Sequence, residues 1–221
     1  MQKLKSIYNK LLKHFGPQHW WPGDTPFEIM IGAILTQNTN WGNVEKAIDN
    51  LKGARVLGAR DLGKINLKKL GELIRPSGYF RVKARKLKVF CRWLIKQGGV
   101  RQLKKQNIQS LRPQLLEIWG IGPETADSML CYALDKSTFV VDAYTKRIGN
   151  RVGLFKFQDY HQIKDFFEQN LPKDLDLYKE YHALLVELGK NYCKPKPVCD
   201  SCPINRLCKK KPLRGEEQRA C

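Results

Sequence analysis

The cysteines of this chain are concentrated near its C-terminal end. Four of the seven, Cys193, Cys199, Cys202 and Cys208, follow a C-x5-C-x2-C-x5-C pattern. Four thiolates so close together can hold a zinc ion or an iron–sulfur cluster, and the spacing by itself fits both. Disulfide bonds are the competing interpretation. We favour a metal centre because such dense cysteine loops in intracellular proteins usually bind metal.

A glycine-containing turn is the second candidate site. Two apolar helical runs flank Gly120-Ile121-Gly122, and Pro123 opens the second run at the first helical position, where a missing N–H costs nothing. Glycines allow backbone N–H groups to approach a phosphate closely, and the second helix directs its positive end to the same place. An ordinary joint between two helices would have the same pattern, so the turn alone is weak evidence.

A carboxylate follows soon after, in the segment Val140-Val141-Asp142-Ala143-Tyr144-Thr145-Lys146-Arg147. An aspartate directly before a helical run is most often an N-cap. From the local sequence alone, Asp142 is therefore predicted to cap the helix that follows it.

The charge distribution points to a polyanionic partner. The chain has 40 Lys and Arg against 21 Asp and Glu, a net charge of +19. No acidic residue lies between Glu72 and Glu117, and this interval carries many cations. A field of one sign attracts nucleic acid, whereas a surface selected for solubility alone usually mixes both signs. A solvated lysine-rich surface is the alternative, and a membrane surface fits less well because no separate basic amphipathic anchor is present.

The elements that must position these residues are helical. Apolar periodicity predicts helices over roughly 4–15, 27–35, 41–52, 66–75, 81–97, 108–118, 123–134, 143–152, 158–170 and 174–192. The one strand-like run, residues 138–141, is too short to build a sheet. We therefore predict an all-α protein. Apolar segments of membrane-spanning length are absent and the first residues lead into an amphipathic pattern, so we expect a cytoplasmic protein without a membrane partner.

Taken together, these features resemble the endonuclease III branch of the helix-hairpin-helix DNA glycosylases. The hairpin L-x-x-I-W-G-I-G-P-E-T-A, the segment V-V-D-A-Y-T-K-R and the terminal four-cysteine loop occur in the family's order, and the resemblance covers nearly the whole chain. It implies a six-helix domain at 24–135 with the hairpin. Residues 1–23 and 136–221 would form a second domain of terminal helices with a [4Fe–4S] loop. The first cysteine gap is five residues, where six is commoner in the family.

The resemblance also assigns roles to individual residues. Asp142 matches the catalytic aspartate. The chemistry agrees with this role, because a fixed carboxylate can stabilise positive charge on a sugar or activate water. Gln37 matches the residue that fills the gap left by a flipped nucleotide, and Tyr79 matches the intercalating wedge, although packing is the alternative for both. The expected partner is damaged double-stranded DNA, bound by a monomer associated with the nucleoid. The expected DNA-binding residues are Gln37, Tyr79, Gly120, Gly122, Thr125 and Lys146.

Two features bear on the reaction and the substrate. Bifunctional members carry a Schiff-base lysine where this chain has Glu124, and a carboxylate cannot form an imine, so we expect no strand cleavage. Trp20, Trp21 and Trp41 look like the base pocket of the family's 3-methyladenine glycosylases, and electron-rich indole rings favour cationic alkylated purines. Packing of these tryptophans in the protein is the alternative.

Other functions stay open at this point. The same scaffold could remove oxidised pyrimidines or mismatched thymine, with or without lyase activity. A non-catalytic iron–sulfur protein that binds DNA, or a zinc-stabilised nucleic-acid adaptor, would share the charge and the cysteine loop.

Overall fold

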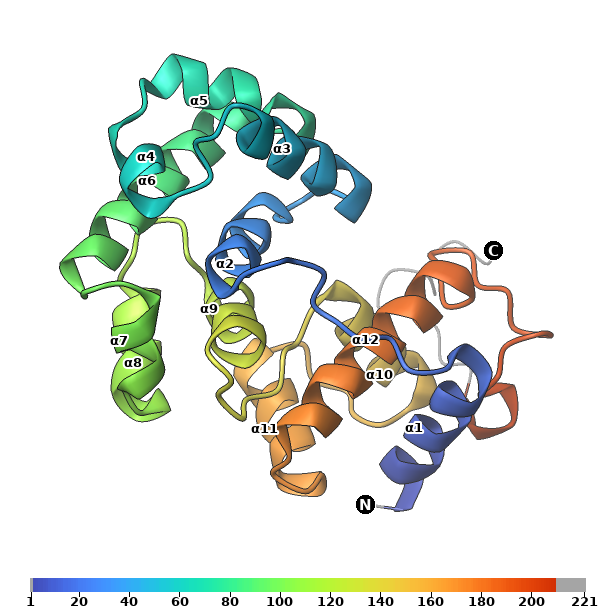
Figure 1. Cartoon of the computed structure of the whole chain (residues 1–221). Coiled ribbons are helices and arrows are strands. Elements are labelled where there is room, and N and C mark those ends of the chain that lie inside the picture. Colours follow the sequence, from blue (N-terminus) through green and yellow to red (C-terminus); the bar gives the residue numbers. More distant parts are fainter. Residues whose placement is uncertain (1, 210–221) are drawn as a thin grey trace. The chain divides into compact units, whose positions relative to one another are not determined.

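The computed structural model describes residues 2–209, and these form helices joined by turns and loops, with no strand among them (Figure 1). The predicted all-α class is therefore confirmed. The described residues divide into two compact units. One is Trp21–Lys136, and the other combines residues 2–20 with 137–209. The resemblance implied a first domain at 24–135.

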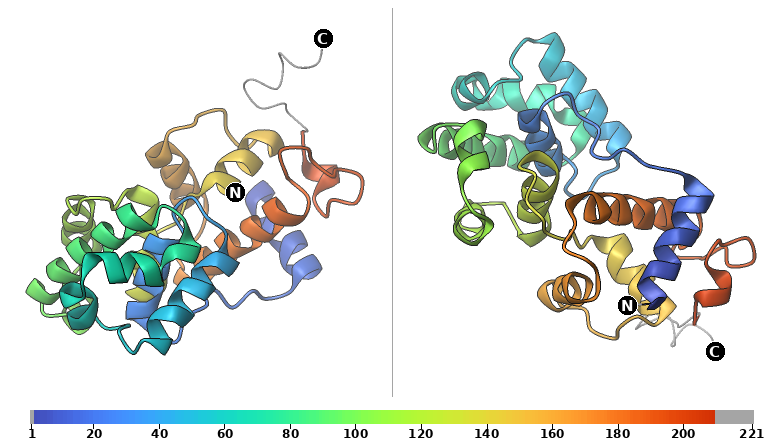
Figure 2. Two further views of the ribbon diagram at one scale, coloured as in Figure 1. Left: turned by 90° about the horizontal axis from the view of Figure 1, so that it is seen from above. Right: turned by 60° about the horizontal axis from the view of Figure 1, so that its bottom comes forward.

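The unit Trp21–Lys136 is built around the buried helix α2 (Pro26–Leu35). This helix begins as its sequence indicates: the Thr25 side chain accepts a hydrogen bond from Glu28 N at 3.1 Å, and proline occupies the first helical position. Its last six residues, 30–35, are all buried. The remaining elements, shown in Figures 1 and 2, are α3 (Trp41–Gly53), α4 (Ala59–Lys64), α5 (Leu67–Leu73), η1 (Arg75–Ser77), α6 (Phe80–Lys96), α7 (Val100–Lys105), α8 (Ile108–Leu116), α9 (Pro123–Ser128) and the π-helical turn η2 (Met129–Ala133).

The six helices expected for this unit are present, with two differences. Helices α4 and α7 were not predicted, because each has six residues and buries one apolar side chain, Leu62 or Leu103, too few to show a helical period. The helix predicted over 66–75 ends at Leu73, and a short 3-10 turn follows. Pro76 explains this break, since proline disfavours helical backbone at the residue before it.

The second unit is centred on the long helix α12 (Leu175–Asn191), which packs against α1 (Gln2–Phe15) and α10 (Ala143–Val152) (Figures 1 and 2). Helix α11 (Tyr160–Asn170) and the short turn η3 (Asn205–Leu207) complete it. The strand-like residues 138–141 adopt no regular secondary structure and pair with no strand; Phe139 N instead donates to the Glu168 carboxylate at 2.8 Å. Phe139 and Val141 are fully buried in the core of this unit, which fixes the direction of the chain as it enters α10.

None of the helices among the described residues combines the length and the apolar character that crossing a membrane requires.

The two helices of the hairpin are joined by a buried ion pair. Arg112 on α8 donates through Nε to Asp127 Oδ1 at 2.7 Å and through Nη2 to Oδ2 at 2.9 Å, and Asp127 is 0% exposed. Removing one partner of such a pair leaves a buried uncompensated charge, which costs about 3–5 kcal/mol. The pair therefore fixes how α9 leaves the hairpin.

We predict that Arg112→Met lowers the free energy of unfolding by about 3 kcal/mol or more. The matched control is Lys104→Met, because Lys104 pairs with Asp135 at 2.7 Å while both side chains stay well exposed, and such pairs contribute about 1 kcal/mol or less. Urea unfolding of the three proteins measures the difference. Equal shifts in the two variants would contradict a structural role for the buried pair.

Candidate nucleic-acid interface and catalytic carboxylate

The two glycines of the hairpin differ in what they make possible. Gly120 has φ +88°, and a Cβ there would lie 2.6 Å from Lys86 Cγ, so the protein itself requires glycine at this position. Gly122 has φ −93° and open space where a Cβ would lie. The fold would therefore accept a side chain at Gly122. Gly122 is also the N-cap of α9, a position that glycine favours, and its open side leaves room for a ligand to approach the backbone.

Gln37, in the loop after α2, is anchored on this hairpin. Its Nε2 donates to Gly120 O at 3.0 Å and to Thr125 Oγ1 at 2.9 Å, and its Oε1 accepts from Lys86 Nζ. Thr125 is buried, so its hydroxyl serves Gln37 in this structure instead of facing solvent. The structure thus brings together three residues that were predicted to contact DNA, and it adds Lys86.

Tyr79 lies at the surface in a strained turn. Its side chain is 70% exposed, which removes the alternative that it packs in the core. Gly78 has φ +67° and Tyr79 has φ +45°, the left-handed conformation that bulky residues rarely adopt. Strain of this kind persists where the surrounding structure imposes it, and it gathers at functional sites. The turn therefore presents an aromatic ring to solvent at the start of α6.

Lys83, one turn into α6, is buried, which the sequence analysis did not foresee. Its side chain is 2% exposed, and Nζ donates to Leu35 O at 2.8 Å and to Ser77 O at 2.6 Å. Burial and, to a smaller extent, the nearby charge of Lys86 together lower the pKa of Lys83 to about 8. In the sequence this residue is one of many cations in an acid-free interval, so nothing distinguished it.

Several other cations of that interval also have internal partners. Lys88 Nζ donates to Ile65 O, while Arg112 and Lys104 form the ion pairs described above. The side chains of Arg75, Arg81, Arg85, Arg92, Lys96, Arg101 and Lys105 are exposed. The positive field expected from the sequence is thus produced by the exposed cations of the interval, and the other cations stabilise the fold.

The three predicted pocket tryptophans fall into two groups. Trp21 and Trp41 meet edge to face with ring centroids 5.6 Å apart, and both rest on Gly32, where a Cβ would lie 3.3 Å from the Trp41 ring. This contact leaves no room for a base between these two rings, so Trp21 and Trp41 do not enclose a base between them in this structure. Trp41 Nε1 also donates to Glu45 Oε1 at 2.7 Å. Glu45 was not foreseen, because an acid at this spacing on a helix is usually only solvated.

Asp142 caps α10, as its local sequence predicted. Its Oδ1 accepts from Thr145 N at 2.7 Å, and its Oδ2 lies 3.8 Å from His182 Nε2 on α12. The Asp142 side chain is 13% exposed and that of His182 is 4% exposed. Trp20, the third predicted pocket residue, meets the His182 ring edge to face at 5.8 Å. The structure therefore gathers a carboxylate, an imidazole and an indole within one unit.

His182 stays neutral near pH 7 for a physical reason. Burial lowers the pKa of its imidazole, and the charge of Asp142 opposes this only in part. A neutral imidazole does not cancel the negative charge of the neighbouring carboxylate. No sequence pattern indicates this pairing, since the two residues lie 40 positions apart.

Helix α10 also connects the carboxylate to the cysteine loop. Arg151 is 5% exposed and donates to the carbonyls of Lys194 and Pro195, while its Nη1 lies 3.7 Å from Cys193 Sγ. Arg147 donates through Nε to Cys193 O at 2.7 Å. Lys146, predicted to bind DNA, is half-buried with Nζ 5.8 Å from the Tyr160 ring centre. Two arginines that look like surface cations in the sequence thus hold the loop.

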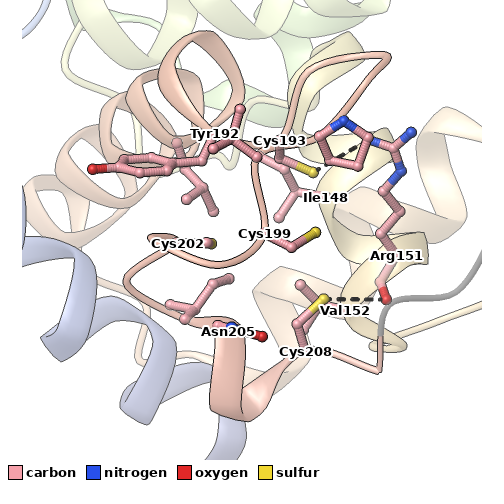
Figure 3. A pocket seen from close by; sticks show the side chains of 13 residues that line it. Ile148, Arg151, Val152, Tyr192, Cys193, Cys199, Cys202, Asn205 and Cys208 are labelled. Atoms are coloured by element: carbon pink, nitrogen blue, oxygen red, sulfur yellow. Dashed lines mark hydrogen bonds between the residues drawn. The ribbon is translucent and has the colours of Figure 1, made fainter.

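The four cysteines of the loop line one cavity of about 150 Å³ (Figure 3). Apolar side chains such as Ile148, Val152 and Leu188 form much of its wall. Burial raises the pKa of the Cys202 thiol, and the other three cysteines raise it further through their charge, so the four sulfurs are close enough to interact. Cys91 and Cys131, which the sequence analysis left outside this set, are buried elsewhere.

Within residues 2–209, no three His, Cys, Asp or Glu side chains converge tightly enough to ligate a single ion. The donor set itself is four thiols around one partly open, largely apolar space, with the cationic Arg151 among its lining residues. Soft thiolates spread around such a space suit a polynuclear iron–sulfur cluster, whose charge a nearby cation offsets.

Comparisons with known proteins agree with this geometry. Residues 31–173 match the family model described as "HhH-GPD superfamily base excision DNA repair protein". The Methanocaldococcus jannaschii protein named "Putative DNA repair glycosylase MJ1434" is 47% identical over 94% of this chain and 96% of its own length. The crystal structure of H. pylori 3-methyladenine DNA glycosylase bound to 1,N6-ethenoadenine is 31% identical, with a TM-score of 0.74 over 86% of this chain and 96% of that one. A trapped endonuclease III–DNA covalent intermediate has the same fold, with a TM-score of 0.80 at 23% identity, and covers 100% of this chain and 98% of that one.

The hairpin glycines give a test that separates folding from ligand contact. We predict that Gly122→Ala leaves the melting temperature unchanged and weakens binding to duplex DNA, because a methyl group there meets no protein atom but blocks a phosphate. Gly120→Ala should lower the melting temperature, since it strains a left-handed residue and displaces the Lys86 stem. Thermal unfolding and fluorescence anisotropy at fixed salt measure both effects. Unchanged DNA affinity in Gly122→Ala would argue against a phosphate at this turn.

Proposed function

As a member of the HhH-GPD superfamily of base excision DNA repair proteins, the chain is a DNA glycosylase, and we propose that it acts as a monofunctional enzyme on alkylated purines such as 3-methyladenine. It cleaves the N-glycosidic bond of a flipped nucleotide and leaves the abasic strand intact. The observation that carries the proposal is the position of Asp142, whose Oδ1 is fixed by the helix cap while Oδ2 takes no part in the cap.

The chemistry required of Asp142 is electrostatic. Breaking an N-glycosidic bond builds positive charge on the sugar, and a fixed carboxylate stabilises that charge or holds the attacking water. Thr145 N–H keeps the carboxylate from rotating, and the neutral His182 preserves its negative charge. An alkylated purine is cationic and leaves readily. A single positioned carboxylate is then enough for the bond to break.

Access to the nucleotide requires duplex DNA to be opened. In this proposal Gly120 and Gly122 hold the backbone, Gln37 fills the gap, Tyr79 wedges the stack, and Thr125 and Lys146 support the contact. The exposed, strained Tyr79 and the docking of Gln37 on the hairpin support these roles. The enzyme would act as a monomer on damaged double-stranded DNA in the cytoplasm, associated with the nucleoid.

The choice of an alkylated purine rests on the tryptophans and on the H. pylori relative, which acts on 3-methyladenine. Trp20, Trp21 and Trp41 supply indole faces, and the Glu45 carboxylate accepts from the Trp41 N–H. That hydrogen bond makes the ring more electron-rich and places a negative charge beside it. Both effects favour a cationic base over a neutral one.

The absence of strand cleavage rests on Glu124, which occupies the position of the family's Schiff-base lysine. A carboxylate has no amine to attack the sugar carbon, so no covalent imine forms there. Lys83, one of two lysines in the same unit whose pKa burial lowers, is 2% exposed and hydrogen-bonded to two carbonyls, so it does not replace it.

The proposed cofactor is a [4Fe–4S] cluster held by Cys193, Cys199, Cys202 and Cys208. Four iron–thiolate bonds would close the loop that Arg147 and Arg151 attach to α10. The cluster would thereby support the helix that Asp142 caps.

A panel of single-lesion duplexes tests the function, scored separately for base release and for strand scission. We predict release of 3-methyladenine, little release from thymine glycol or mismatched thymine, and no strand scission. Asp142→Asn should keep its melting temperature within a few degrees and lose about 10²-fold or more of the base-release rate, because it removes the stabilising charge. Trp41→Ala should lose release of the alkylated base selectively.

Two results would contradict the proposal, one its statement that no strand is cleaved and the other the glycosylase activity itself. A covalent protein–DNA adduct trapped by borohydride would show lyase chemistry despite Glu124. Binding of damaged duplex without release of any base, unchanged in Asp142→Asn, would leave a DNA-binding protein instead of a glycosylase.

The cofactor is tested on the purified full-length protein. We predict a brown protein with visible absorbance, iron and acid-labile sulfide, and we expect Cys199→Ser to lose all three. Cys91→Ala is the control, because Cys91 is a buried thiol outside the loop whose pKa burial raises to about 12. A colourless protein that contains zinc would contradict the iron–sulfur assignment.

A further inference from the structure

Lys83 is a buried cation whose partners are two backbone carbonyls, Leu35 O and Ser77 O. The charged group acting on it is Lys86, of the same sign, and no carboxylate of the described residues compensates it. A buried cation without a counter-ion is costly, and methionine would fill a similar volume without that cost. The contribution of Lys83 therefore lies in the two hydrogen bonds that its ammonium donates.

The two carbonyls belong to the segments that carry the residues proposed to enter DNA. Leu35 ends α2, where backbone carbonyls have no partner within the helix, and Gln37 follows two residues later. Ser77 ends η1, and Tyr79 follows two residues later. One ammonium thus bridges two chain segments about 40 residues apart in the sequence and joins each close to its functional side chain.

Lys86 extends the same arrangement to the hairpin. It lies three residues further along α6, and its Nζ donates to Gln37 Oε1. Its stem passes so close to Gly120 that a Cβ there would collide with three of its carbons. Through two lysines on one face, helix α6 therefore contacts Gln37, the turn that precedes Tyr79, and the hairpin.

We infer that Lys83 is a positioning residue that presets the spacing between Gln37 and Tyr79 before DNA binds. This inference rests on the proposed function, in which the two side chains act together on one duplex. Opening a base pair requires the wedge and the gap-filling group to arrive at the same step, and a fixed spacing removes the entropy cost of aligning them.

The experiment compares the affinity of the full-length protein for two duplexes of one sequence. One contains an abasic-site analogue opposite 2-aminopurine, which offers a gap, and the other is fully paired. We expect Lys83→Met to lower the preference for the abasic duplex by about tenfold, since misplacement by about 1 Å can cost this much or more. Its affinity for the paired duplex should stay unchanged, because Lys83 is buried and reaches no phosphate.

The matched control is Lys88→Met. Lys88 lies on the same helix, and its replacement removes the same charge. It donates to Ile65 O, which lies outside the two segments that carry Gln37 and Tyr79. It should keep the preference of the unchanged protein. Lys83→Arg should restore most of the preference, because a guanidinium can also donate to two carbonyls. If Lys83→Met does not fold, Lys83→Gln replaces it, since its amide retains two N–H donors but is shorter.

Three outcomes would overturn the inference: an unchanged preference in the Lys83 variants, an equal loss in Lys88→Met, or a parallel loss of affinity for both duplexes. The fluorescence of 2-aminopurine gives an independent readout of insertion into the gap. Failure of the proposed function looks different. In that case the unchanged protein releases no base from any lesion, although the binding preference still depends on Lys83.

Discussion

The last turn of a helix leaves backbone carbonyl groups without partners inside the helix, and loops have similar unpaired carbonyls. In each unit of this protein, a buried cation from another helix donates hydrogen bonds to such carbonyls. In the unit Trp21–Lys136, Lys83 donates to the last carbonyl of α2 and to Ser77 O. In the other unit, Arg151 donates to Lys194 O and Pro195 O in the cysteine loop. Each bond satisfies a backbone acceptor that would be expensive to leave unpaired away from water. Each also fixes a loop that carries candidate functional residues.

This use of cations changes how the charge of the chain is understood. A net charge of +19 suggests a surface that attracts a polyanion, and many exposed arginines and lysines remain available for that role. Lys83, Lys86 and Arg112 instead shape the segments that would meet the DNA, and Arg151 holds the cysteine loop. Long-range attraction and local positioning are therefore carried by different members of the same residue class.

Asp142 illustrates how one side chain serves two purposes. As an N-cap, its carboxylate accepts a hydrogen bond from Thr145 N–H, and this bond fixes the Asp142 rotamer when the protein folds. The entropy cost of ordering the side chain is therefore already met before any ligand binds. The same restriction prepares its second oxygen for electrostatic work, with the neutral imidazole of His182 beside it. The local interpretation, a helix cap, and the functional one, a catalytic carboxylate, are compatible because a carboxylate has two oxygens.

The sequence by itself determined the helical class, the starts of α2 and α10, the cap at Asp142 and the cysteine loop, because these depend on local periodicity and spacing. It could not distinguish Lys83 from its neighbours, pair His182 with Asp142, or show that Trp21 packs against Trp41 on Gly32. Burial and the partners of a charge are set by residues distant in the chain. A lysine or arginine becomes a buried donor where the fold brings a backbone carbonyl to it, and it is otherwise a solvated surface group. Only the tertiary structure decided which of the two each residue is.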